Sequence, residues 1–389
     1  MPSRRRWKSM PNPLHSATLH CARITHKTCW TFVRLTTEDG RTGDGEATLQ
    51  GREDGLMAAA ERLVPTALPQ ASLDDPGAFA RQHAPRDIGE ASVVSALDQA
   101  LWSLHAELRE RSLGQILGIK RSAVPVYANI NRRTEQRTPE GFAASAQAAM
   151  AAGHVAFKLA PFDEVNPRVC SAGDGVPAMQ AGLARIAAVR EAIGDDARLM
   201  VDCHWRFDEA TARELNEAAA KLGVHWIETP IAETVENISA LVRLRRQCNA
   251  LEFCQAGLEM GIGWDAFRPY CEAGAYDVVM PDVKYMGGLH EVVQTAERCA
   301  ELGVGVSPHN PSGPICHAVS LQVSSALDAF DMLEMQFDES ALFDELVAAP
   351  FGPTRKGHIA TPSGPGLGVT LSEKVLQRIA DRPAQVWRR

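Results

Sequence analysis

An acid and a histidine follow a short apolar run in the segment RLMVDCHWRFD, residues 198–208. The run Leu199, Met200, Val201 is typical of a parallel strand that is buried on both faces, and it stops at Asp202. Side chains alternate along a strand, so Asp202 and His204 are expected to point into one shared space. Carboxylate and imidazole groups are the side chains that proteins use to bind cations and to move protons.

Polar residues also end the other strand-like runs of the second half of the chain. In chain order these candidates are Lys158, Asp202 with His204, Glu228, Glu259, Asp282, His309 and Glu334. Asp202, Glu228 and Glu259 end three successive runs, so they should converge on one point. Buried carboxylates without a counter-charge are costly, and a hard cation that takes oxygen ligands is the simplest compensation. Mg²⁺ fits best, because it accepts retained waters and substrate oxygens.

Each of these residues also has an ordinary structural explanation. A single acid at a strand end is more often a helix cap or a loop ion pair. Glu228 precedes Pro230 closely and could be a turn residue, while Glu334 could pair with a basic neighbour. Seven successive strands of one repeat end in polar residues, and this regular placement favours a shared site over seven unrelated structural roles.

The repeat that positions these residues predicts a (β/α)₈ barrel of the TIM type over residues 124–349. The strand-like runs are 124–130, 155–160, 198–203, 224–228, 252–258, 276–281, 303–307 and 330–335, with helix patterns such as GLARIAAVREAIG and LHEVVQTAERCAELG between most of them. In such a barrel the active site lies at the carboxyl ends of the strands. An open doubly wound sheet is the alternative, but no glycine-rich phosphate loop follows the first strand.

A smaller α+β capping domain is predicted from the two ends of the chain. Residues 1–123 contain a β pattern at 17–48, with a Glu38-Asp39-Gly40 turn, and a helix pattern at 90–118 that ends at Gly118. Residues 350–389 are rich in proline and glycine at first and are expected to return to this domain.

Composition limits the partners. The 389 residues carry a net charge of -8, which argues against nucleic acid, and no window approaches the roughly 18 apolar residues of a membrane span. The basic start MPSRRRWKSM lacks a following apolar run, so we expect an untethered arm and no secretory signal. Nine cysteines without a Cys-x-x-Cys pair fit reduced thiols in the cytoplasm.

These motifs together resemble the enolase superfamily, in its mandelate racemase/muconate lactonizing enzyme-like branch, and most of all its sugar-acid dehydratases of the galactonate dehydratase type. TTEDGRTGDGEAT and ALDQALWSL are similar to the capping hairpin and helix of that branch, and PSGPGLGVTL to its returning C-terminal segment. The resemblance implies that Asp202, Glu228 and Glu259 hold Mg²⁺ and that His309 with Asp282 removes the α-proton of a carboxylate substrate. VDCHWRF is similar to the strand end whose histidine protonates the departing hydroxyl, which assigns that role to His204.

One departure from the branch narrows the reaction. Relatives often carry Lys-x-Lys at the second strand, whereas here Lys158 is followed by Ala160 in the second position. A two-base racemase is therefore disfavoured, and a Mg²⁺-dependent dehydratase of a sugar acid or small α-hydroxy acid is predicted. An epimerase, racemase or cycloisomerase, with His204 or Lys158 as second base, is the alternative, and a metal-binding barrel without turnover is a third. The resemblance also implies a homo-oligomer.

Overall fold

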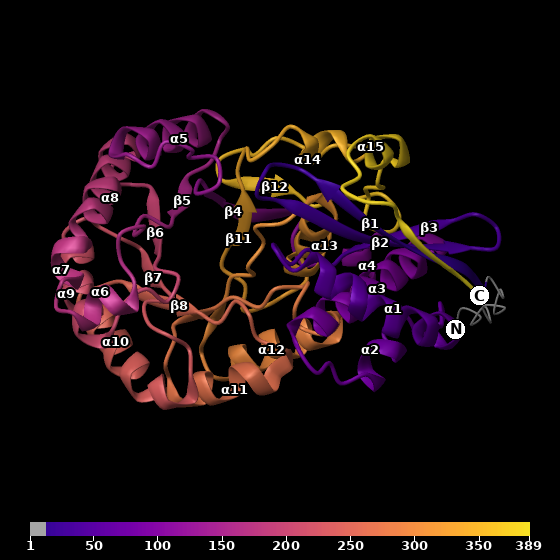
Figure 1. Cartoon of the computed structure of the whole chain (residues 1–389), viewed down its shortest axis with the longest axis horizontal. Helices are drawn as coiled ribbons and strands as arrows, with labels where there is room; N and C mark the ends of the chain where they lie inside the picture. Colours follow the sequence, from indigo (N-terminus) through magenta and orange to yellow (C-terminus); the bar gives the residue numbers. More distant parts are fainter. Residues whose placement is uncertain (1–12) are drawn as a thin grey trace, which may run out of the picture.

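The computed structural model describes residues 13–389 as a ring of parallel strands beside an antiparallel sheet with its own helices (Figure 1). The predicted basic arm MPSRRRWKSM lies outside these residues. Within residues 13–389 no helix has both the length and the apolar character that crossing a bilayer requires. All nine cysteines lie in this range and are free.

The predicted barrel is confirmed. Eight parallel strands follow the order β10-β9-β8-β7-β6-β5-β4-β11, and a parallel bridge between Val306 and Phe330 joins the two ends of this order. The strands are β4 (Ala123–Asn129), β5 (Ala156–Leu159), β6 (Arg198–Asp202), β7 (Trp226–Glu228), β8 (Cys254–Gly257), β9 (Val278–Val279), β10 (Gly305–Val306) and β11 (Leu333–Gln336). Each of the eight predicted runs overlaps one of them, and six of the runs contain their strand entirely.

Helices between the strands surround the barrel on its outside (Figure 1). In α12 the buried residues recur at intervals of three and four, as Leu289, Val292, Thr295, Ala296 and Cys299, so one stripe of the helix faces the strands. The other elements are α5 (Pro139–Ala151), α6 (Pro167–Ser171), α7 (Gly175–Ala178), α8 (Gln180–Ile193), α9 (Glu209–Ala220), η1 (Val235–Asn237), α10 (Ile238–Ala250), α11 (Gly263–Ala273), α12 (Leu289–Glu301), α13 (Pro314–Ser324) and α14 (Leu342–Glu345).

A four-stranded antiparallel sheet forms the cap, in the order β13-β1-β2-β3. Its strands are β1 (Leu14–Arg23), β2 (Cys29–Thr37), β3 (Thr42–Glu46) and β13 (Gln385–Arg388), and helices α1 (Glu53–Gln70), α2 (Ala78–Gln82) and α3 (Ile88–Leu108) complete it. A Cβ on Gly43 would lie 2.3 Å from the Ala100 carbonyl oxygen, and one on Gly45 would lie 1.9 Å from that of Ala96. The glycines of this hairpin therefore let β3 lie directly on α3.

Two details differ from the sequence prediction. The helix pattern at 90–118 is two helices, α3 and α4 (Leu113–Leu117), because Glu110 takes a left-handed conformation (φ 54°) and Ser112 starts α4 with a capping box. The C-terminal segment pairs with β1 through β13, as expected, but its strand β12 (His358–Ala360) pairs with β4 of the barrel. Helix α15 (Glu373–Arg378) lies between these two strands in the chain.

Candidate active site

Inside the barrel, each of three neighbouring strands carries a buried apolar residue followed two positions later by a charged one. Ala156, Met200 and Trp226 belong to a buried apolar cluster inside the barrel. The residues two positions later point to the same side of their strands, and they are Lys158, Asp202 and Glu228. The apolar layer therefore forms a floor on which the charged layer rests.

Three carboxylates of this polar layer converge as predicted. Asp202 ends β6 and is paired in register with Glu228, which ends β7, and Glu259 follows β8 by two residues. One oxygen from each lies within 4.8 Å of the others. Each of the three residues is at most 5% exposed.

The electrostatics of this triad fit a bound cation. Burial, together with the charges of Asp202 and Glu334, raises the pKa of Glu228 to about 8 against the opposing charge of Lys158. Burial and the charges of Asp202 and Glu228 raise the pKa of Glu259 well above its usual range. A divalent cation with oxygen ligands would relieve both effects, so these residues fit the metal that the sequence predicts.

The backbone bends sharply where these strands end. His204, Trp205, Thr229 and Leu258 all have positive φ angles, between 44° and 64°, although none is glycine. Such conformations cost energy and persist only where surrounding contacts enforce them. His204 therefore does not continue the strand alternation assumed from the sequence; the bend brings it back toward Asp202.

His204 and Asp202 share two contacts. The backbone N–H of His204 donates to Asp202 Oδ1 at 2.9 Å, and His204 Nε2 lies 2.7 Å from Asp202 Oδ2. The charge of Asp202 raises the pKa of the His204 imidazole, while burial would lower it. The expected pairing of acid and histidine is thus present in the structure.

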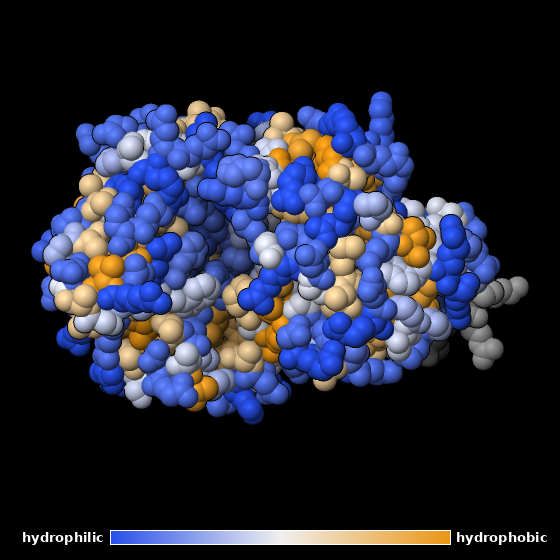
Figure 2. Space-filling view, in the orientation of Figure 1, coloured by the Kyte–Doolittle hydropathy of each residue, from blue (hydrophilic) through white to orange (hydrophobic). Residues whose placement is uncertain are grey.

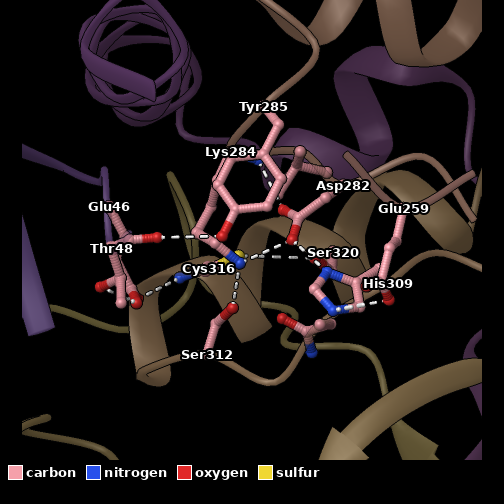
Figure 3. Close-up of polar contacts among 12 residues, drawn as sticks. Glu46, Thr48, Glu259, Asp282, Lys284, Tyr285, His309, Ser312, Cys316 and Ser320 are labelled. Atoms are coloured by element: carbon pink, nitrogen blue, oxygen red, sulfur yellow. Dashed lines mark hydrogen bonds and ion pairs between the residues drawn. The ribbon is translucent and has the colours of Figure 1, made fainter. Parts of the chain in front are cut away.

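The His309–Asp282 pair lies at the next strand ends (Figure 3). Each residue follows its strand, β9 or β10, by three positions. His309 Nδ1 is 2.8 Å from Asp282 Oδ2, and its Nε2 is 3.3 Å from Glu259 Oε2. Since a carboxylate only accepts, Nδ1 donates to Asp282, and this bond directs Nε2 toward Glu259 of the triad.

Lys158 and Glu334 form a buried ion pair, which contacts the triad at Glu228. Lys158 Nζ lies 2.7 Å from Glu228 Oε1 and 2.9 Å from Glu334 Oε1, and it is 1% exposed. Glu334 is the second residue of β11, so it lies inside that strand and not at its end. It also accepts from the Asn129 amide at 2.7 Å and from the Asn310 backbone at 2.9 Å.

A cavity of about 930 Å³ opens above these groups. Figure 2 shows a hollow at the centre of the barrel with mostly hydrophilic residues around it. Lys158, Asp202, His204, His309 and Glu334 line the cavity, and so does the cap, through residues 25–28 and 48–50. The site is therefore bounded by both parts of the fold, as suits a small polar ligand.

Two charged residues at this site, the buried Lys284 and the half-buried Glu233, were not found from the sequence. Lys284 Nζ lies 2.6 Å from Asp282 Oδ2. Glu233 accepts hydrogen bonds from the Trp205 indole at 2.9 Å and from the Leu258 backbone at 2.7 Å, which ties together the bent ends of β6 and β8. Lys284 is two residues from Asp282 but lies in the turn after β9, where strand alternation does not apply, and nothing local to Glu233 indicates its distant partners.

Comparison with known proteins identifies the family of this chain. The model of the mandelate racemase/muconate lactonizing enzyme N-terminal domain matches residues 6–118, and that of the enolase C-terminal domain-like family matches residues 141–375. The chain belongs to the mandelate racemase/muconate lactonizing enzyme family. It is 28% identical to a D-gluconate dehydratase of Thermoproteus tenax, covering 91% of this chain and 70% of the relative. It is also 28% identical to a D-galactonate dehydratase of Ralstonia pickettii, covering 92% and 94%.

Solved structures share the whole fold. A mandelate racemase/muconate lactonizing enzyme from Jannaschia superposes with a TM-score of 0.81 at 21% identity and covers 96% of this chain and 99% of its own. An enolase protein from the Sargasso Sea superposes with a TM-score of 0.81 at 25% identity and covers 97% and 99%. The cap and the barrel of this mandelate racemase/muconate lactonizing enzyme family member therefore match as one unit.

Proposed function

We propose that this protein is a Mg²⁺-dependent dehydratase of sugar acids, which converts a 2,3-dihydroxy acid into a 2-keto-3-deoxy acid. One observation carries the proposal: a histidine lies on each side of the carboxylate triad, because His204 contacts Asp202 and His309 contacts Glu259. Strands β6 and β10, which precede these histidines, stand four strands apart in the ring of eight. The curated relatives named above act on gluconate and galactonate.

Asp202, Glu228 and Glu259 would hold the cation. Their ligand atoms are all oxygens, which is the donor set that Mg²⁺ prefers. Bound there, the cation would supply positive charge against the negative charge that develops on the substrate carboxylate when the α-proton leaves.

The two histidines would divide the proton transfers. His309 Nε2 takes the α-proton as general base while Asp282 holds Nδ1, and the electron pair of the broken C–H bond forms the enediol double bond. His204 then donates a proton to the β-hydroxyl as the C–O bond breaks, so the hydroxyl leaves as water. The resulting enol takes up a proton at the β-carbon and releases the proton of its enol hydroxyl, which gives the 2-keto acid.

The buried Lys158–Glu334 pair would set the charge and the position of the carboxylate triad. Lys158 Nζ is bound to two carboxylates, Glu228 and Glu334, so it has no free lone pair with which to act as a base. Burial alone would lower its pKa, but the charges of Glu228 and Glu334 raise it well above the ordinary value. We assign Lys158 and Glu334 to positioning of the triad.

A screen for turnover tests this proposal. Purified protein with Mg²⁺ is incubated with a library of aldonic and aldaric acids, and 2-keto acid is measured as its semicarbazone. We expect product from at least one acid, with none from the His309→Asn variant. Racemised or epimerised acid without keto acid would contradict the proposal.

The proposal also covers the cellular compartment and the oligomeric state of the protein. Nine free cysteines fit a reducing compartment, the cytoplasm. The family resemblance predicts a homo-oligomer, which sedimentation velocity would measure.

A further inference from the structure

Lys284 is a buried cation beside the His309–Asp282 pair (Figure 3). Its side chain is 1% exposed, and its Nζ lies 2.6 Å from Asp282 Oδ2. Its backbone N–H also donates to Asp282 Oδ1, at 2.8 Å. One residue therefore holds both oxygens of the same carboxylate.

The His309 imidazole depends on that carboxylate for its orientation. His309 Nδ1 is 2.8 Å from Asp282 Oδ2, the oxygen that Lys284 Nζ also contacts. Asp282 is 0% exposed, so no solvent stabilises its charge. A buried carboxylate is costly without a partner of opposite charge, and Lys284 supplies the cation nearest to Asp282.

We propose that Lys284 is a positioning residue for the base: it fixes Asp282 as an oriented carboxylate, and Asp282 in turn fixes His309. This inference rests on the proposed function, in which His309 removes the α-proton. Lys284 is not itself a base, because the charge of Asp282 raises the pKa of its ammonium above the ordinary value, although burial would lower it.

Lys284 also contacts the junction of barrel and cap, which gives a competing role. Its Nζ donates to Ser312 Oγ, in the segment before α13. Shortly after Ser312 in the chain, the backbone N–H groups of Gly313 and Cys316 donate to the buried Glu46 carboxylate of β3, at 2.8 and 2.9 Å. A purely structural Lys284 would act through Ser312 on this junction, whereas a positioning Lys284 acts through Asp282.

A double-mutant cycle separates the two roles. We expect Lys284→Met to lower kcat on the order of 10- to 100-fold, with KM changed less than about 3-fold, because a general base contributes about 10²- to 10⁴-fold. If Lys284 acts through Asp282, adding Lys284→Met to Asp282→Asn should lower kcat no further. The control Ser312→Ala keeps the ammonium on Asp282, so its loss should stay below about 5-fold, the size of one ordinary hydrogen bond.

The double variant also guards against misfolding. If Lys284→Met alone does not fold, the double variant removes both buried charges together and still reports whether Lys284 matters beyond Asp282. Independent, multiplicative losses in the cycle, or wild-type kcat in Lys284→Met, would overturn the inference. So would a loss in Ser312→Ala equal to that in Lys284→Met.

One readout does not depend on turnover. In ¹⁵N spectra of histidine-labelled protein, His309 should show one tautomer, with the proton on Nδ1, in the wild type and a mixture in Lys284→Met. An inactive wild type with this spectral change would refute the proposed function and keep the role of Lys284. An active wild type with unchanged His309 signals in Lys284→Met would refute the role of Lys284 alone.

Discussion

Replacing Lys158 by methionine is expected to destabilise the protein strongly when no metal is bound. Methionine keeps a flexible apolar chain of similar length but carries no charge. The change leaves Glu228 and Glu334, both 0% exposed, without the ammonium that lies 2.7 and 2.9 Å from them. The perturbation therefore removes one cation from two buried carboxylates.

The expected loss follows from the contacts that remain. Removing one partner of a buried ion pair typically costs about 3–5 kcal/mol. Glu334 keeps its hydrogen bonds from Asn129 and Asn310, and Glu228 keeps that from the Trp226 indole, so we expect the lower end, about 3 kcal/mol. With saturating Mg²⁺ the loss should shrink, because the proposed cation on Glu228 replaces part of the missing charge.

Urea unfolding with chelator and then with Mg²⁺ measures this loss. The matched control is Lys120→Met, which breaks an ion pair with Asp328 at 2.5 Å whose side chains are 45% and 78% exposed. Exposed pairs contribute about 0–1 kcal/mol, so the control should change the free energy of unfolding little. A loss in Lys158→Met no larger than that of the control would refute the electrostatic reasoning.

Three further predictions follow from the site and its surroundings. Glu259→Gln should weaken Mg²⁺ binding at least about 10-fold by calorimetry, and unchanged affinity would contradict the ligand assignment. Trp205 follows His204 directly, and its indole N–H donates to Glu233 at 2.9 Å, so Trp205→Phe removes a hydrogen bond beside His204. This change should lower keto-acid formation about 10-fold. An equal loss of α-proton exchange would contradict a role through His204. Burial lowers the pKa of His317 to about 3, so below about pH 6.5 the unfolded chain binds a proton that the folded chain does not. Stability should therefore fall toward low pH by about 2–3 kcal/mol at pH 4.5 through this group, and His317→Gln should flatten that slope in urea titrations at several pH values.

Much of the fold could be predicted because the barrel repeats one simple pattern. The apolar runs were located even where the strands are only two residues long, as in β9 and β10. The helix pattern at 90–118 ends at Gly118 as predicted, but apolar spacing does not reveal the break at Glu110, whose φ is 54°. The pairing of β12 with β4 was also missed, since three residues of a proline-rich tail carry no periodic signal.

The candidate site was predictable where its residues end successive parallel strands. Asp202 and Glu228 are neighbours in register, so a list of strand ends brings them together without coordinates. Glu233 could not be found in this way, because its partners Trp205 and Leu258 come from the ends of two other strands. The left-handed bend of His204 was equally invisible, although the sequence correctly grouped His204 with Asp202.

The central claim is that two histidines divide dehydration into proton removal by His309 and hydroxyl loss assisted by His204. The most direct measurement is ¹H NMR of the His204→Asn variant with an active acid sugar in D₂O. We predict that deuterium enters the α-position while 2-keto acid formation falls by about 10²-fold or more, because the base acts before the acid. Keto-acid formation at the wild-type rate would contradict the account. So would the loss of α-proton exchange along with the loss of keto-acid formation.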